Sequence, residues 1–281
     1  MNDMYTRFRA YWMPNGGVSM SYSVDTSFIL IEGRYNEDNR GKILSEMKLT
    51  GKESLDLLHI SSWNDKRCNP IELDNLLKEL KPLDIEIPAY EPKTESGLQC
   101  RKIIREYYQK SLYATLFEVG HNTIVRLAEL EDLDYLDPIF TPLRKFEEDA
   151  DNAVVKLFRA GKFGVMNLSD CIHDNEIVEQ IDRVDLKNSI DVLILNDVSL
   201  VESSDFLQKL IDICSPRSIL SLNNWRILVR NDNPFAKEGI SIVISEQKDV
   251  IIKYGLSKNL TTPPADDVSV MKNMVYNEHN I

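Results

Sequence analysis

The chain lacks any long apolar segment and has few cysteines. No stretch of its 281 residues approaches the roughly 18 consecutive apolar residues of a membrane-spanning helix, and Met1–Arg9 lacks the apolar core of a signal peptide. Its four cysteines are widely spaced and form no CxxC pair, which is typical of reduced thiols. We therefore expect a cytoplasmic protein that makes no contact with a membrane.

The sequence also lacks the usual features of phosphate and nucleic-acid binding. Gly161–Gly164 does not have the glycine spacing or the trailing Lys-Ser/Thr of a P-loop. Acidic residues number 45 against 33 basic ones, and the net charge of −12 argues against broad nucleic-acid binding across the surface. The basic pairs Lys66-Arg67 and Arg101-Lys102 have no interleaved aromatic residues, which a platform for single strands requires. We expect no strong general binding of nucleic acid.

Short apolar runs alternate with helical patterns, which predicts an α/β protein with one large core. Extended segments are predicted at Thr6–Trp12, Ser27–Ile31, Ile85–Pro88, Asn152–Phe158, Gly161–Asp170, Ser218–Leu222, Gly239–Ser245 and Asp249–Tyr254. Helices are predicted from Pro70 with Asn69 as N-cap, over Leu98–Gln109 with Thr94 or Ser96 as cap, and over Phe206–Cys214. The last two extended segments are expected to form a hairpin. Residues 1–60 are expected to supply strands of the first sheet, with a polar loop at Arg34–Gly41.

The polar loop between a short apolar run and the helix at Pro70 is the most informative part of the chain. It reads Leu57-Leu58-His59-Ile60-Ser61-Ser62-Trp63-Asn64-Asp65-Lys66-Arg67-Cys68-Asn69-Pro70. The order of strand, loop, helix and strand resembles the first active-site loop of the metallo-β-lactamase superfamily, and most of all the hydrolase branch related to ComEC-type DNA-uptake proteins. That branch has Thr-His-x-Asp-x-Asp-His at this point. The resemblance places Ser62, Asn64, Lys66 and Arg67 where the family has its metal ligands.

Three later segments extend the resemblance over roughly residues 5 to 255. Glu32-Gly33 matches an acidic residue and a glycine that end a strand of the family, and Ser169-Asp170 matches the Gly-Asp pair whose aspartate bridges the metals. The run from Ile190 to Ser199 places Asp197 and Val198 at two family histidines. The resemblance implies a four-layer αββα sandwich, with two mixed β-sheets and helices outside. It would occupy residues 1–256 with an insert at about 110–150, followed by a flexible or docking tail at 257–281.

These replacements remove the chemistry that the resemblance would otherwise imply. Hydrolases of the family use imidazole and carboxylate ligands to hold zinc or manganese ions, which ionise a water molecule. Ser62 and Asn64 are weak ligands, and Lys66 and Arg67 are cations at neutral pH. Two positive charges at roughly 5 Å from a dication would oppose its binding by about 13 kcal/mol at an effective dielectric near 20. We therefore expect no resident cofactor and no catalysis at this loop.

Three functions are compatible with this pattern. The first is a pseudo-enzyme that acts as a binding or regulatory subunit for a protein partner encoded in the same system. Resemblance alone suggests that this is a multi-gene bacterial defence system. The second is a residual metal-dependent phosphodiesterase or nucleotide hydrolase. Its rearranged site would hold zinc or manganese through Asp170, His173, Asp197 and Asp65. The third is a sensor in which Lys66 and Arg67 bind an anionic, nucleotide-like ligand.

Other residues near the loop have structural interpretations. Asp170 and Asp197 would converge in such a fold, where Lys66 or Arg67 is expected to neutralise one of them. His59 precedes the loop on a strand that should be buried, so we expect a hydrogen-bonded core histidine. Cys68 is interpreted as a small buried residue rather than a zinc ligand.

Overall fold

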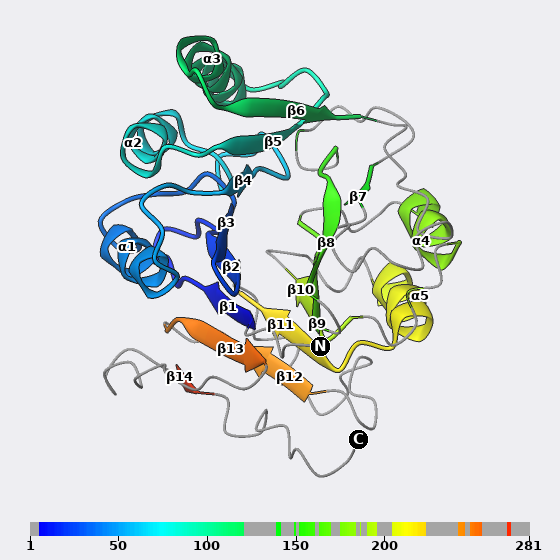
Figure 1. Cartoon of the computed structure of the whole chain (residues 1–281). Helices are drawn as coiled ribbons and strands as arrows, with labels where there is room; N and C mark the ends of the chain where they lie inside the picture. The colour runs from blue at the N-terminus through cyan, green and yellow to red at the C-terminus, as the bar shows by residue number, and fades with distance from the viewer. Residues whose placement is uncertain are drawn as a thin grey trace.

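The computed structural model describes residues 6–120, 139–141, 149, 152–160, 163–169, 175–183, 186, 190–195, 204–222, 241–244, 248–254 and 269–270. Two β-sheets face each other across these residues, and helices cover the outer face of each (Figure 1). The predicted four-layer αββα sandwich is therefore confirmed. No helix in these ranges is long and apolar enough to cross a membrane.

Among the described residues, the first sheet has eight strands in the order β14-β13-β1-β2-β3-β4-β5-β6. Their bounds are β1 Thr6–Ala10, β2 Met20–Val24, β3 Ser27–Ile31, β4 Leu57–His59, β5 Asp84–Pro88, β6 Thr115–Val119, β13 Val250–Tyr254 and β14 Ser269–Val270. The strands from β13 to β3 pair antiparallel, whereas β3, β4, β5 and β6 pair parallel. The parallel half thus brings the carboxyl ends of β3, β4 and β5 to one edge, where the candidate site lies.

The second sheet has six strands in the order β12-β11-β10-β9-β8-β7. Their bounds are β7 Ile139–Phe140, β8 Val155–Ala160, β9 Phe163–Asn167, β10 Val192–Leu195, β11 Ser218–Ser221 and β12 Ser241–Ile244. The strands from β9 to β12 pair parallel, and β7, β8 and β9 pair antiparallel. This sheet is mixed as well.

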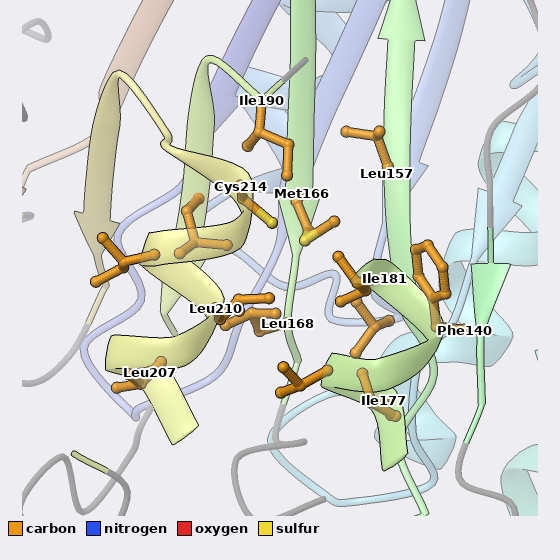
Figure 2. Packing of buried hydrophobic residues seen from close by; sticks show 14 of the residues in the cluster. Phe140, Leu157, Met166, Leu168, Ile177, Ile181, Ile190, Leu207, Leu210 and Cys214 are labelled. Carbon is orange, nitrogen blue, oxygen red and sulfur yellow. The ribbon is translucent and has the colours of Figure 1, made fainter. Parts of the chain in front are cut away.

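Three apolar cores separate the four layers. The helices α1 Arg40–Leu49, α2 Pro70–Leu80 and α3 Glu95–Lys110 pack on the outer face of the first sheet. The helices α4 Asn175–Asp182 and α5 Ser204–Cys214 pack on the second sheet, where Figure 2 shows Leu210 of α5 beside Leu168 and Ile181 of α4 near Met166. The third core, which includes Phe8, Tyr22 and Phe163, lies between the sheets.

The helix boundaries follow the capping residues of the sequence. The Asn69 side chain accepts hydrogen bonds from the backbone N–H groups of Ile71 and Glu72, at 3.1 and 3.3 Å, and Pro70 begins α2. Thr94, rather than Ser96, caps α3 by accepting a hydrogen bond from the backbone N–H of Gly97 at 3.1 Å. Both of these predicted helices are confirmed, as is the third, Phe206–Cys214, which falls within α5 Ser204–Cys214.

Two expectations about the arrangement of elements are wrong. Residues 1–60 supply not only strands but also α1, which buries Ile43, Glu46 and Met47. The expected hairpin of the last two extended segments does not form: β12 pairs with β11 in the second sheet, whereas β13 pairs with β1 in the first. The chain therefore passes from the second sheet at β12 to the first sheet at β13.

The proposed division into a domain, an insert and a tail stays a prediction. Within residues 110–150, β6 lies at the edge of the first sheet and β7 at the edge of the second. Within residues 257–281, the short strand β14 pairs parallel with β13.

Candidate functional site

A fully buried carboxylate stands at the centre of the candidate site. Glu32 directly follows β3 with a positive φ of 73°, and its side chain has no solvent exposure. It accepts hydrogen bonds from the Ser61 backbone N–H at 3.1 Å, the Ser61 hydroxyl at 2.5 Å and the Asn167 amide at 3.2 Å. Within the described residues, three hydrogen-bond donors therefore satisfy the Glu32 carboxyl group.

The same network joins the two sheets. The hydroxyl oxygens of Ser61, after β4, and Ser169, after β9, lie 2.5 Å apart. Because the single proton of Ser61 goes to Glu32, Ser169 is the donor in this contact. Ser169 has a positive φ of 54°, and its backbone N–H donates to the Asn167 side chain at 3.1 Å. The loop after β4 thus meets the residue that precedes Asp170.

Ser62 and Asn64, which the resemblance aligns with the first two metal ligands of the family, form hydrogen bonds with backbone groups in and near the loop. The Ser62 hydroxyl donates to the backbone carbonyl of Asp149 at 3.0 Å, and that carbonyl also accepts from the Tyr90 hydroxyl at 2.7 Å. The Asn64 side-chain oxygen accepts from the backbone N–H of Lys66 at 2.9 Å. Ser62 is fully buried. These oxygens stabilise the loop.

The two cations of the loop differ in their access to solvent. Arg67 has no exposed surface, whereas Lys66 is half-buried. Three donors hold the backbone carbonyls of this stretch. The backbone N–H groups of Val18 and Gly33 donate to the carbonyls of Lys66 and Arg67, at 2.9 and 2.7 Å. The Arg34 side chain donates to the carbonyl of Asp65 at 2.9 Å. Arg34 is fixed in turn by a two-pronged contact with Glu72 of α2.

Four of the predicted site positions lie outside the described residues, namely Asp170, His173, Asp197 and Val198. Their convergence, and the pairing of Lys66 or Arg67 with an aspartate, stay predictions. So does the anion-binding role of Lys66 and Arg67.

A second buried polar cluster connects the sheets beside this network. Glu86 of β5 accepts hydrogen bonds on one oxygen from His59 of β4 at 3.0 Å and from Lys156 of β8 at 2.6 Å. Burial alone would raise the pKa of Glu86, but the His59 hydrogen bond and the Lys156 charge outweigh it and lower the pKa to about 2. His59 also packs edge-on against Phe158, with ring centroids 5.4 Å apart. The prediction of a hydrogen-bonded core histidine is confirmed.

The described residues do not fit the metal centre that the fold family implies. Among them, no three His, Cys, Asp or Glu side chains are grouped so that they could hold an ion. Ser62 and Asn64 already make structural hydrogen bonds, and the buried Arg67 adds a positive charge. Metal binding at this loop would require breaking those hydrogen bonds and compensating that charge.

The cysteines of the described residues are buried thiols. Cys68, Cys100 and Cys214 have no solvent exposure. Burial, reinforced by a contact with Cys100, raises the pKa of Cys68 well above its usual range. Burial also raises the pKa of Cys214 to about 12. Since metals bind the thiolate, these values favour the interpretation of Cys68 as a core residue.

Thiol titration of the folded protein should therefore find these three cysteines unreactive. A disulfide reagent such as Ellman's reagent reacts with the thiolate; burial denies it access to all three thiols, and the raised pKa of Cys68 and Cys214 further suppresses the thiolate form of these two. The Cys171→Ser variant should show no reactive thiol until denaturant is added, and three afterwards. Rapid labelling of Cys68 or Cys214 in the native variant would contradict the described packing.

Comparison with known proteins identifies the fold. No protein-family model matches the chain, and no curated protein matches its sequence. A mutant of CmlA β-hydroxylase matches with a TM-score of 0.55 and 11% identity, over 91% of this chain and 54% of that one. This chain therefore spans about half the length of the hydroxylase.

Two further structures match over their whole length. A diphosphatase from the PhnP family has a TM-score of 0.50 and 11% identity, over 90% of this chain and 100% of that chain. The metallo-β-lactamase fold protein YhfI from Bacillus subtilis has a TM-score of 0.51 and 10% identity, over the same shares. Such identities establish the fold and not the activity. The two facing mixed sheets and these likenesses show that the chain has the metallo-β-lactamase fold.

Proposed function

We propose that this chain is a catalytically inactive protein of the metallo-β-lactamase fold that acts as a binding or regulatory subunit for a protein partner. One observation carries the proposal: positions that the resemblance aligns with metal ligands are used to hold the loop. Ser62 binds the carbonyl of Asp149, Asn64 binds the backbone of Lys66, and Arg67 is fully buried.

The electrostatics of the network support the same conclusion. A metal centre needs carboxylates whose charge a cation neutralises. Glu32 instead receives three hydrogen bonds, and Glu86 is paired with Lys156. The buried Glu32 and the half-buried Glu86 are therefore both compensated by protein groups. A scaffold in this state keeps its shape without an ion.

A residual hydrolase is the second candidate, because the contact between Ser61 and Ser169 brings the sequence neighbour of Asp170 to the loop. In that proposal Asp170, His173, Asp197 and Asp65 hold zinc or manganese for hydrolysis of a phosphodiester or nucleotide. The likeness to a diphosphatase is compatible with this class of substrate.

Metal content and hydrolysis distinguish the two candidates. Protein purified from medium supplemented with zinc and manganese should carry well under one ion per chain by mass spectrometry. Its hydrolysis of bis(p-nitrophenyl) phosphate, with either metal added, should equal that of the Asp170→Ala/Asp197→Ala double variant. This variant is the matched control because it removes both carboxylates of the alternative site.

Two outcomes would contradict the proposal. One ion per chain, lost in the double variant, would show that a metal site survives. Turnover that falls in the double variant together with the ion would establish the hydrolase as the function instead.

A further inference from the structure

The loop at the candidate site is closed to solvent. Four of its residues, Ser61, Ser62, Trp63 and Arg67, have no solvent exposure. A partner or a substrate therefore cannot touch their side chains directly. Any binding at this face of the loop requires that a contact covering it is released first.

Asp149 covers the loop with its backbone. Its carbonyl oxygen accepts hydrogen bonds from the Ser62 hydroxyl at 3.0 Å and from the Tyr90 hydroxyl at 2.7 Å. The Tyr90 hydroxyl oxygen in turn accepts from the backbone N–H of Trp63 at 3.0 Å. One carbonyl thus holds Ser62 directly and the next residue of the loop through Tyr90.

The carboxylate of Asp149 is bound at the start of α3. It accepts from the backbone N–H of Lys93 at 2.9 Å, and from the backbone N–H and the hydroxyl of Thr94, each at 3.2 Å. Thr94 is the N-cap of α3, so this carboxylate lies at the positive end of the helix dipole. Hydrogen bonds to a charged group are stronger than those between neutral groups. These contacts anchor Asp149 over the loop.

The chain that follows is held in a different way. The Val154 backbone N–H donates to the carbonyl of Ser61 at 2.8 Å, and Ala153 is fully buried in the core between the second sheet and its helices. Apolar burial therefore fixes these two residues, whereas Asp149 is anchored by hydrogen bonds. Such hydrogen bonds can break in a local opening while the apolar core stays intact.

We propose that Asp149 is an autoinhibitory latch, which keeps the loop closed while its carboxylate is bound to α3. Its release uncovers the hydroxyl groups of Ser62 and Tyr90, which lose their common acceptor and become able to bind a polar group from outside. Ala153 and Val154 stay in place and serve as the hinge. The inference does not depend on the proposed function, because a protein partner and a phosphodiester would both need this access.

A purely structural cap of α3 would behave differently from a latch. It would open only when the whole fold unfolds, so the amides that it binds would exchange as slowly as those of the core. A latch opens at a lower free-energy cost than global unfolding and exposes the loop when it does so.

Native-state hydrogen exchange of the wild type at low denaturant tests for such an opening. The backbone amides of Lys93 and Thr94, whose acceptor is the Asp149 carboxylate, should exchange faster than global unfolding allows and with a weaker dependence on denaturant. The Val154 amide should follow global unfolding, because it belongs to the hinge.

Chemical labelling tests whether Asp149 covers the loop. The Ser62→Cys substitution in a Cys171→Ser background places a thiol under the latch, and iodoacetamide should label it slowly. Adding Asp149→Ala should speed the labelling by roughly 10- to 100-fold, the factor expected for a lost hydrogen bond to a charged group. Glu95→Ala is the matched control, because Glu95 is an exposed carboxylate in the first turn of the same helix. It should leave the labelling rate unchanged.

Three results would overturn the inference. The first is exchange of the Lys93 and Thr94 amides at the rate of global unfolding alone. The second is a labelling rate at position 62 that is the same with and without Asp149. The third is faster labelling together with an equal loss of protection at Val154, because Asp149 would then stabilise the whole fold and not the closed loop.

Discussion

Replacing Glu46 by glutamine should lower the free energy of unfolding by about 3–5 kcal/mol, because it removes the carboxylate that pairs with the buried Arg7 and one of the two that pair with the buried Arg9. Glu46 of α1 contacts Arg7 at 2.5 Å and Arg9 at 2.7 Å, on neighbouring positions of β1. Arg9 also contacts Asp249 at 2.6 Å. All four side chains are at most 7% exposed. The cluster attaches α1 to the first sheet through charges that solvent does not screen.

Urea unfolding monitored by circular dichroism measures this effect. The matched control is Glu106→Gln on α3, whose contacts with Lys102 and Lys110, at 3.9 and 3.7 Å, are exposed. That variant should lose at most about 0.5 kcal/mol. Equal losses for the two variants would mean that the buried cluster contributes no more than surface charge.

Replacing Glu86 by glutamine should remove much of the acid sensitivity of the fold. The folded-state pKa of Glu86 is about 2, below the roughly 4.3 of a free glutamate. A carboxylate with a lowered pKa stabilises the fold above its unfolded pKa, and this contribution is lost as the pH falls from about 4.3 through 2. The difference corresponds to about 3 kcal/mol at neutral pH.

The pH profile of urea unfolding, between pH 7 and 2, tests this expectation. The wild type should lose stability steeply in the acid limb, and Glu86→Gln should start lower and follow a shallower slope. Glu91→Gln serves as control, because Glu91 is 68% exposed although it also pairs with an arginine. Identical slopes for the wild type and Glu86→Gln would show that the contact with Lys156 does not govern acid unfolding.

Local sequence signals predicted the helices α2 and α3 because capping residues and apolar spacing agree there. Asn69, Pro70 and the buried leucines of α2 all indicate the same start and the same face. The helix α1 was missed because its buried face includes the charged Glu46 between Ile43 and Met47. Apolar periodicity cannot reveal a helix that is partly held by ion pairs.

The candidate site stays a prediction, but the structure shows contacts of its loop that the sequence did not indicate. The loop from Ser61 to Arg67 was singled out by resemblance, and its contact with Ser169 lies where the resemblance implies. Tyr90 and Asp149 gave no signal, because they are distant in sequence from the loop residues that they contact, and Lys156 is likewise distant from its partner Glu86. Such contacts depend on how the two sheets face each other, which local pattern does not encode.

A crystal of the protein soaked in zinc or manganese and measured at the absorption edge of the metal tests the central claim most directly. We expect no anomalous peak within coordination distance of Ser62, Asn64 or Arg67, with the Ser62 hydroxyl still bound to the Asp149 carbonyl and Glu32 still bound to Ser61. A fully occupied ion at this loop, or one held between Asp170, His173 and Asp197, would contradict the account and identify a working metal centre.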